Sequence, residues 1–527
     1  MADKMDQGEF GPSDKEKKYD RQLRLWAASG QAALESAHLL LVNSGAGTVG
    51  VETLKNLVLP GIGQFTIADD AVVNTADLGV NFFLDESSLG TSRARACTDF
   101  LLELNPEVKG NSFSGSEKGS ALNEALSQGH RYTAILYTLP LAPEAIEQVQ
   151  SYSQEHCVPL IAIHCVGYYA YFRVGLPGPF PVVDTHPEQT ATEDLRLLTP
   201  WPELSEFAAS MTSDIDNLDA HKHGHIPLVV ILLHYIELWK QQHDGNPPTK
   251  YADKIAFRKA IVDAMRKDNA EGGEENFEEA AAAVMKHVVE PQLPPSLREI
   301  FEFDHSKDTL NKSFWIISDA LKAFYQTNHR LPVSGGLPDM KAESNVYIQL
   351  QNIYKTKARQ DAAEILQAVQ KVPGGEAITK EEVDLFCANA RFAKLINANA
   401  NAVQLGLEVE RQLGNDEIAA VAGPEMPLSL LPIYLALNAT SHQTTASATE
   451  IQNFVLNKAE GYKDNERAMK IAEEVARSAG GELHNISAAV GGMVAQELIK
   501  VITRQYIAID NTCIYDGIES RCQILRL

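Results

Sequence analysis

The sequence predicts an α/β protein with a Rossmann-like parallel sheet, in which a large, mainly α-helical insertion interrupts the domain. Two observations predict the sheet. Strand-like and helix-like segments alternate over about the first 165 residues, and a glycine-rich turn joins the first strand to the first helix. A third observation predicts the insertion, because helical periodicity dominates the middle of the chain and the alternating style returns only near the C-terminus.

The first strand, turn and helix form a βαβ fingerprint typical of nucleotide-binding domains. Glycines permit the tight turn and let backbone N–H groups approach a phosphate at the positive end of the helix. An acid at the end of the second strand can accept hydrogen bonds from ribose hydroxyls. We expect a strand at 38–42, a helix from 51 and a second strand at 65–68. The candidate nucleotide-binding residues are Gly45, Gly47, Gly50 and Asp69.

The remaining elements follow from hydrophobic periodicity and from turn residues. In the first segment they are a helix at 94–104, a strand at 132–137, a helix at 143–155 and a strand at 159–163. Helices of the insertion are expected at 227–241, 257–266, 277–289, 311–325 and 344–369. A helix at 487–503 and edge strands within 505–516 and 523–525 complete the α/β domain. We therefore expect this domain at 1–168 and 481–527, with the insertion at 169–480.

Composition narrows the class of protein. The 527-residue chain has a formal net charge of −24, which argues against a nucleic-acid binder because phosphate contacts need a basic surface. No apolar run of roughly 20 residues is found, so no membrane partner is expected. The polar N-terminus matches neither a signal peptide nor a transit peptide, which favours the cytoplasm or the nucleus. Six scattered cysteines without a C-x-x-C pair predict neither disulfides nor structural zinc.

Four segments of the chain together resemble the ubiquitin-activating enzyme family. They are Tyr19–Trp26, Gly45–Gly50, Lys55–Gly63 and Val490–Lys500. In that family two related adenylation halves pair, activate the C-terminal carboxylate of a ubiquitin-like modifier with MgATP, and pass it to a cysteine. The resemblance implies an adenylation fold of the ThiF/MoeB type. It also implies that the insertion corresponds to the catalytic-cysteine domain of the family.

The chain holds only one of the two halves. Two further segments, Leu337–Ala342 and Tyr347–Tyr354, resemble the non-catalytic half in the neddylation branch of the family, where the halves lie in separate subunits. The resemblance implies a heterodimer with the catalytic subunit of the neddylation-activating enzyme. A ubiquitin-like modifier is the second partner that it implies, and neither nucleic acid nor a membrane is expected as a partner.

The residues around the glycine turn depart from the competent half of the family. Joining a carboxylate to the α-phosphate of ATP needs cations on the phosphates and a carboxylate that holds Mg²⁺. By resemblance, a second acid is expected at Ala71, an arginine–glutamine pair at Val80–Asn81 and a lysine at Arg93. The metal-binding aspartate should stand near Thr138. We therefore expect no metal and no productively bound cofactor in this chain, and we expect the partner subunit to use MgATP.

The insertion lacks a candidate cysteine for thioester formation, which needs an exposed and activated thiolate. No cysteine occurs between Cys165 and Cys387. Cys387 stands in an apolar helical setting that indicates a core thiol. We therefore expect this chain to have no enzymatic activity by itself.

Arg21 is the residue expected to act in catalysis. By resemblance, the arginine of this Tyr-Asp-Arg-Gln segment reaches from the inactive half into the partner's ATP site and contacts the terminal phosphates. Its planar, permanently charged guanidinium would act as an arginine finger in trans. The alternative is that Arg21 pairs with Asp20 or caps a helix. Tyr19 and Trp26 are expected to pack, whereas Arg24 is either a second phosphate contact or an interface residue.

Several features have alternative explanations. The glycine turn and Asp69 either keep a vestigial nucleotide site or persist because the helix packs closely on the sheet. The His221–His225 segment could suggest a metal, but it fits better as a polar start to the next helix. His164 is expected to be a satisfied core or strand-end histidine, and Gly491–Gly492 is expected at a close helix–sheet or subunit contact. An NAD-dependent oxidoreductase or a free-standing scaffold would leave the four family segments unexplained.

Overall fold

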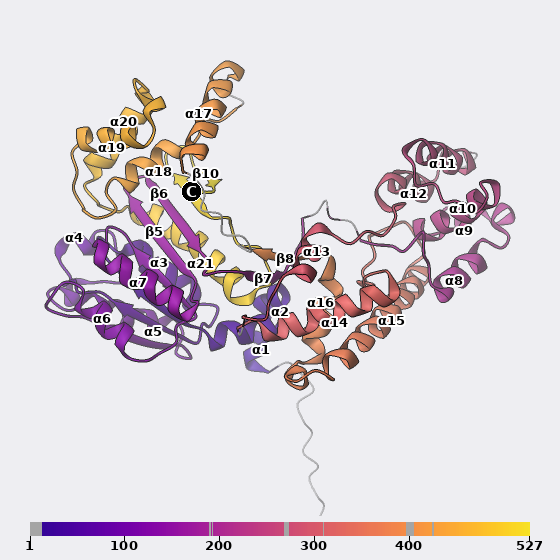
Figure 1. Cartoon of the computed structure of the whole chain (residues 1–527), viewed down its shortest axis with the longest axis horizontal. Helices are drawn as coiled ribbons and strands as arrows, with labels where there is room; N and C mark the ends of the chain where they lie inside the picture. The colour runs from indigo at the N-terminus through magenta and orange to yellow at the C-terminus, as the bar shows by residue number, and fades with distance from the viewer. Residues whose placement is uncertain are drawn as a thin grey trace, which may run out of the picture. The chain divides into compact units, whose positions relative to one another are not determined.

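The chain divides into two compact units. The computed structural model describes residues 13–188, 191, 193–267, 273–308, 310–396, 405–423 and 426–527. One unit, the sheet unit, combines the chain up to Phe180 with Ile396–Leu527, and the other, the helical unit, is Pro181–Leu395. In Figure 1 the sheet unit therefore contains both the indigo and magenta elements of the N-terminal segment and the yellow elements of the C-terminus.

An eight-stranded sheet forms the centre of the sheet unit, in the order β10-β9-β6-β5-β4-β1-β2-β3. The five strands β1 to β5 are parallel, whereas β6, β9 and β10 are antiparallel to their neighbours. The strands β1 and β4 are almost fully buried, as expected for apolar strands covered by helices on both faces. The bounds are β1 His38–Val42, β2 Gln64–Ala68, β3 Lys109–Phe113, β4 Ala134–Thr138, β5 Leu160–Val166, β6 Tyr169–Gly175, β9 Thr512–Asp516 and β10 Arg521–Leu525.

Helices cover both faces of this sheet. The helices α3, α5 and α21 pack on one face, and α6, α7 and α18 contribute to the core on the other. This arrangement confirms the predicted α/β class with a doubly wound parallel sheet. The helices are α1 Asp14–Lys18, α2 Asp20–Ser36, α3 Thr48–Val58, α4 Thr75–Leu78, α5 Arg93–Leu104, α6 Ser120–Ser127, α7 Pro143–His156, α17 Leu405–Ala422, α18 Leu431–Asn438, α19 Ala448–Lys458, α20 Glu466–Ser478 and α21 His484–Thr503.

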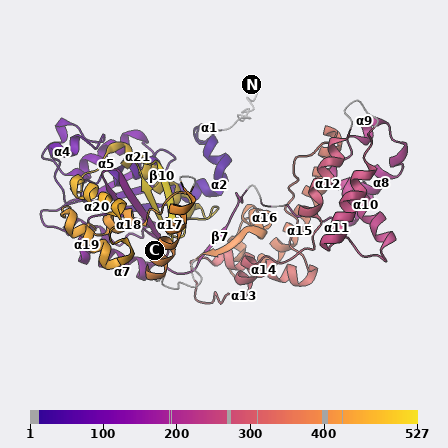
Figure 2. The ribbon, with the colours of Figure 1, turned by 90° about the horizontal axis from the view of Figure 1, so that it is seen from above.

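The predicted end of the helical insertion at residue 480 needs correction. The helical unit ends at Leu395, and α18 packs instead on β5, β6 and β9 of the sheet unit. Figure 1 shows this helix beside β5 and β6, and Figure 2 shows it beside α19 and α20 of the same unit. Its sequence is apolar on every side, and Leu431, Ile433 and Leu435 are fully buried. Helical periodicity identifies such a segment as a core helix but does not indicate which core it joins.

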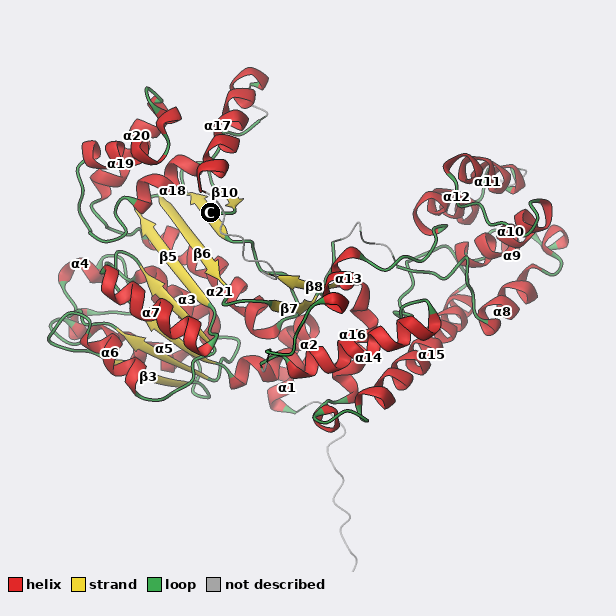
Figure 3. Cartoon of the chain, in the orientation of Figure 1, coloured by secondary structure: helices red, strands yellow, loops and turns green. Residues whose placement is uncertain are grey.

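The start of the insertion also moves, from residue 169 to Pro181, because β6 pairs with β5 along its whole length. Beyond that point helices dominate (Figure 3). A short pair of strands, β7 (Phe180–Val183) and β8 (Ala393–Ile396), forms where the chain passes into and out of the unit. The helices are α8 Pro202–Thr212, α9 Ala220–His223, α10 Leu228–Gln242, α11 Tyr251–Ala264, α12 Glu275–His287, α13 Pro295–Glu302, α14 Lys312–Asn328, α15 Ser344–Val369 and α16 Lys380–Asn389.

The helix α21 ties the C-terminal segment to the N-terminal one by packing along α3. In the described part of the chain it is the one helix long and apolar enough to cross a membrane, but 56% of its apolar stretch is buried within the domain. A Cβ atom at Gly491 would lie 2.9 Å from both the Thr53 nitrogen and the Glu52 Cβ, so glycine permits the close approach. A Cβ at Gly492 would meet no atom within 4 Å.

This difference makes the two glycines a matched pair. Gly491→Ala is expected to lower the free energy of unfolding by about 1–3 kcal/mol, because the backbone of α3 must shift to admit the new Cβ. Gly492→Ala is expected to raise it by about 0.5–1 kcal/mol through helix propensity. Chemical unfolding followed by circular dichroism measures both values. Equal effects of the two substitutions would contradict the close α3–α21 contact.

Candidate functional site

A cavity of about 420 Å³ lies at the carboxyl ends of β1, β2 and β4. The chain runs from β1 outward to β2 and β3, and then returns to place β4 on the other side of β1. Ligands of doubly wound sheets bind where the strand order reverses in this way. The cavity is lined by the start of the glycine turn, by Asp69 and Asp70, and by Arg93. Of the four candidate nucleotide-binding residues, Gly45 and Asp69 line this cavity.

The glycine turn has the backbone that the fingerprint predicts. Gly45 and Gly47 have φ angles of +63° and +68°, and Gly47 is the N-cap of α3. A Cβ at Gly47 would collide with the side-chain amide of Asn43, and one at Gly50 would lie 2.8 Å from Asn43 Oδ1. The turn therefore requires glycine for its own backbone and packing, whether or not it meets a nucleotide.

Arg93 occupies the inside of the turn and forms a two-pronged ion pair with Asp69. Its Nε lies 2.7 Å from Asp69 Oδ2, and its Nη2 donates to Asp69 Oδ1 at 3.2 Å. Its Nη1 donates to the Gly45 carbonyl at 2.9 Å and lies 3.3 Å from Asp77 Oδ1. Arg93 and both carboxylates are buried. Burial acts to lower the pKa of Arg93, but the attraction of Asp69 outweighs it and the pKa is raised.

This pairing engages two residues of the candidate site. Arg93 stands where the resemblance implied a phosphate-binding lysine, and its donors point at Asp69, Asp77 and the turn itself. Asp69 is the candidate acceptor for ribose hydroxyls, and its two oxygens already accept from Arg93, from Asn43 Nδ2 at 3.0 Å and from the Ala71 N–H at 2.9 Å. The sequence motif could not predict the Arg93–Asp69 pair, because Arg93 lies 24 residues after Asp69.

A second carboxylate occupies the positive end of α3. Glu482 Oε2 accepts from the Val49 N–H at 2.8 Å and from Ser487 Oγ at 2.6 Å. The side chain is buried, and burial raises the pKa of Glu482 while these hydrogen bonds oppose the rise. The first N–H groups of a helix favour an anion, and here the anion comes from the chain itself. The sequence held no signal for this contact, which joins residues 433 positions apart.

The neighbouring polar groups are also engaged within the fold. Asp70 accepts from the Gly119 N–H at 2.6 Å and from the Ala121 N–H at 3.0 Å, at the start of α6. Thr138, which stands where the family places a metal-binding aspartate, is buried and accepts from the Ser44 N–H at 2.7 Å. The described residues contain no cluster of three or more side chains that could hold a metal ion.

Arg21 lies on the exposed first part of α2 and forms no hydrogen bond or ion pair with any described residue. The alternative that it pairs with Asp20 is wrong, because Asp20 pairs with Arg24, whose Nη2 lies 2.9 Å from Asp20 Oδ2. Tyr19 is buried, as predicted, and its hydroxyl donates to Glu107 at 3.0 Å. The N-terminal arm, residues 14–26, is thus anchored at Tyr19 while Arg21 remains free.

Trp26 marks the end of this arm. It is buried and its indole N–H donates to Gln31 Oε1 at 3.1 Å, so the prediction of a packing role is confirmed. The backbone leaves helical geometry at Trp26 and Ala27, and α2 continues beyond this kink. The arm therefore consists of α1 and the first part of α2, and the kink separates it from the rest of α2.

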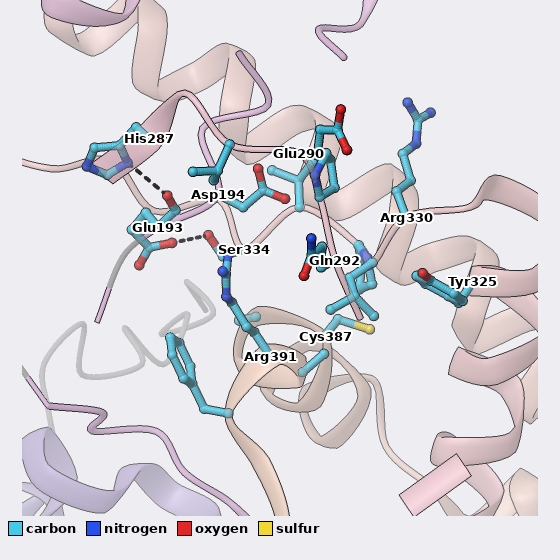
Figure 4. A pocket seen from close by; sticks show the side chains of 18 of the residues that line it. Glu193, Asp194, His287, Glu290, Gln292, Tyr325, Arg330, Ser334, Cys387 and Arg391 are labelled. Carbon is cyan, nitrogen blue, oxygen red and sulfur yellow. Dashed lines mark hydrogen bonds between the residues drawn. The ribbon is translucent and has the colours of Figure 1, made fainter. Parts of the chain in front are cut away.

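Cys387 is a core thiol, as the sequence predicted. It is 4% exposed, and burial raises its pKa to about 12. It lies in the wall of a cavity of about 60 Å³ in the helical unit, beside Tyr325 and Arg391 (Figure 4). A thiol that remains protonated and covered is a poor nucleophile.

The histidine segment is structural. His223 is buried, its Nδ1 lies 2.7 Å from Glu274 Oε1, and its ring stacks on Phe277. His221 and His225 stack on each other. A metal site, which the sequence analysis disfavoured, has no support in the described residues.

His164 is fully buried in β5, as expected, but it is not satisfied. Neither ring nitrogen has a hydrogen-bond partner in the described part of the chain, and the ring lies edge-on to Tyr171 at 5.7 Å. Burial lowers its pKa to about 3, so the folded protein holds it neutral.

Comparison with known proteins decides the family. The model of the ThiF family matches residues 19–527. The "NEDD8-activating enzyme E1 regulatory subunit" of Danio rerio is 34% identical, over 98% of this chain and 99% of its own length. The chain belongs to the ThiF family and, within it, to the NEDD8-activating enzyme E1 regulatory subunits. The Gallus gallus member is 35% identical, over 97% of this chain and 98% of its own length.

Membership in the ThiF family confirms the adenylation-type α/β fold and the resemblance on which the sequence analysis relied. The solved structure of E. coli MccB with ATP is similar over 32% of this chain and 50% of its own, with a TM-score of 0.27 and 18% identity.

Removal of the Arg93 guanidinium tests the internal ion pair. Arg93→Met is expected to lower the free energy of unfolding by about 3–5 kcal/mol, because Asp69 and Asp77 would remain buried without their cation. Arg95→Met on the exposed face of α5 is the control, with an expected change within about 0.5 kcal/mol. Urea titration of the two variants gives both values, and a small effect at Arg93 would show that the pair is dispensable.

The pKa of His164 predicts a pH-dependent stability. The unfolded chain takes up a proton on this residue below about pH 6.5, whereas the folded chain does not until about pH 3. Stability is therefore expected to fall by about 2 kcal/mol between pH 7 and pH 5. His164→Leu should flatten this part of the curve, and His221→Leu, on an exposed histidine, should leave it unchanged. The same slope in all three proteins would refute a neutral buried His164.

Proposed function

We propose that this chain is the regulatory subunit of a heterodimeric enzyme that activates a ubiquitin-like modifier of the neddylation type. Its partner is then a catalytic subunit that adenylates the modifier C-terminus with MgATP and forms the thioester. Support comes from relatives of that name that align with this chain over nearly their full length. The enzyme is complete only as the pair.

We further propose that the chain does not adenylate the modifier by itself. The observation that carries this proposal is the Arg93–Asp69 pair, which fills the inside of the glycine turn. Three buried carboxylates, Asp69, Asp77 and Glu482, lie around the glycine turn, and the buried cation Arg93 pairs with the first two. The exposed Lys118 is a second cation in the lining of the cavity. Phosphates added to such a site would meet negative charge and few free donors. No productive cofactor is therefore proposed for this chain.

The thioester step is likewise assigned to the partner. Cys387 is the one cysteine of the helical unit, and its buried thiol has a raised pKa. A transfer reaction needs a thiolate that the activated modifier can reach.

The contribution of this chain to the chemistry is proposed to be Arg21, supplied in trans to the ATP site of the partner. The arm presents a permanent cation without an internal counter-ion, on a base fixed by Tyr19. A guanidinium in that position would stabilise the negative charge that develops as pyrophosphate leaves. The pairing of Asp69 with Arg93 disfavours the alternative of an NAD-dependent oxidoreductase. Such an enzyme would need the Asp69 carboxylate to accept hydrogen bonds from the ribose of NAD, and Arg93 already engages that carboxylate.

ATP–pyrophosphate exchange by the chain mixed with catalytic subunit, modifier and MgATP tests these assignments. Arg21→Ala is expected to reduce the exchange rate at least about a hundredfold, the scale of a lost transition-state donor. Co-purification with the catalytic subunit should persist. Arg477→Ala, which removes an exposed arginine paired with Glu474 on α20, is the control and should retain full activity.

Each other outcome contradicts one assignment. Full exchange with Arg21→Ala would remove the arm from the mechanism while leaving the heterodimer intact. Exchange by this chain alone would show that its own site is competent. Absence of exchange in the complete wild-type mixture would overturn the function proposed for the pair.

A further inference from the structure

The helix α11 of the helical unit carries a local charge opposite to that of the whole chain. Residues 250–267 contain six basic and two acidic side chains, whereas the protein has a net charge of −24. The helix lies beside α10 and α12, with Phe257 and Ile261 fully buried against them (Figure 1). Its other side faces solvent.

Three exposed side chains line up on this solvent side at the spacing of a single helical stripe, Tyr251, Ile255 and Arg258. Val262 continues the same spacing but is partly buried against the core of the unit, and the partly buried Lys254 lies beside them. Tyr251 is 72% exposed and Ile255 is 49% exposed. We call these five residues the α11 stripe. It combines an aromatic ring and two aliphatic side chains with two cations, and it contains no acid.

The two cations of the α11 stripe have no counter-ion among the residues that the structure describes. The side chains of Lys254 and Arg258 form no ion pair or hydrogen bond there, although the backbone N–H of Lys254 takes part in the helix. The neighbouring Lys259, off the stripe, does pair with Asp263. An exposed tyrosine with aliphatic and arginine neighbours has the composition of a protein-binding hot spot rather than of an ordinary solvated surface.

We propose that the α11 stripe docks an acidic segment of a partner protein, in which carboxylates flank an apolar side chain. The carboxylates would pair with Lys254 and Arg258, and the apolar side chain would pack on Tyr251 and Ile255. The stripe extends over twelve residues of helix, from Tyr251 to Val262, a rise of about 16 Å that an extended segment of about five residues matches. The charge of −24 repels a long polyanion such as nucleic acid, whereas a short acidic segment meets mainly the local cations.

The probe is a fluorescein-labelled peptide with the sequence Glu-Glu-Leu-Glu-Glu. The full chain is titrated into it, and binding is followed by the fluorescence anisotropy of the label. Wild-type protein is expected to bind the peptide saturably. Binding should be weaker at 300 mM NaCl, where the Debye length is roughly 6 Å, than at 50 mM NaCl, where it is roughly 14 Å. Lys254→Glu with Arg258→Glu is expected to weaken binding at least about tenfold. The control, Lys463→Glu with Lys470→Glu, makes the same charge change on the sheet unit and should stay within about twofold.

Apolar docking is tested separately. Ile255→Ser is expected to weaken peptide binding about threefold, and replacing the leucine of the peptide by serine should do the same. The protein and peptide substitutions together should lower the affinity little more than either one alone, because both remove the same apolar contact. Equal helix content and melting temperature of all variants exclude unfolding as the cause.

Several outcomes would overturn the proposal. The first is that peptide binding does not saturate at protein concentrations up to 1 mM. The second is that the control variant loses as much peptide affinity as the charge-reversed α11 variant. The third is that the effects of the two serine substitutions on affinity add. Tighter binding of a single-stranded oligonucleotide or of anionic phospholipid vesicles, lost on charge reversal, would assign the stripe to another class of partner. Dimerisation of the wild-type chain in sedimentation, abolished by the same reversal, would assign it to a second copy.

Discussion

The crevice of this domain depends on the buried pair of Arg93 and Asp69. The guanidinium joins the end of β2 to the carbonyl of Gly45 and reaches Asp77, and the three charged side chains are buried. A buried ion pair of this kind is stable only when its remaining donors and acceptors are satisfied, and here they are. The fingerprint is therefore held in shape by the protein itself. A competent adenylation site would leave such groups for phosphate and ribose.

Glu482 applies the same constraint to the start of α3. Its carboxylate satisfies the Val49 N–H and the Ser487 hydroxyl, so it connects the glycine turn with the first turn of α21. The two sequence segments of the α/β domain meet at this contact and along the α3–α21 packing at Gly491. A long insertion between the segments is tolerated because loop closure costs only logarithmically more with length. The Glu482 carboxylate thus stabilises the fold at the N-terminus of α3, the place where a nucleotide-binding domain would bind a phosphate.

Local pattern was enough to predict much of this architecture. The strands β1, β2, β4 and β5, the long α15 and the position of the crevice follow from apolar runs, turn residues and one glycine motif. Contacts between distant residues were not predictable in the same way. The partner of Arg93, the role of Glu482 and the attachment of α18 to the sheet unit depend on which surfaces meet in three dimensions. Periodicity reports that a face is buried but not what buries it.

A division of labour follows from these internal bonds. In a catalytic site the charged groups would contact the substrate, but here they pair with one another within the fold. The crevice is therefore rigid and offers few free hydrogen-bond donors. The arm is the opposite case, since Tyr19 fixes its base through Glu107 and Asn105 while Arg21 has no counter-ion among the described residues. A cation that is to act on another subunit must be unpaired in its own and must project from a rigid support. The arm meets both conditions, whereas Arg93 in the crevice lies on a rigid support but is paired within its own chain.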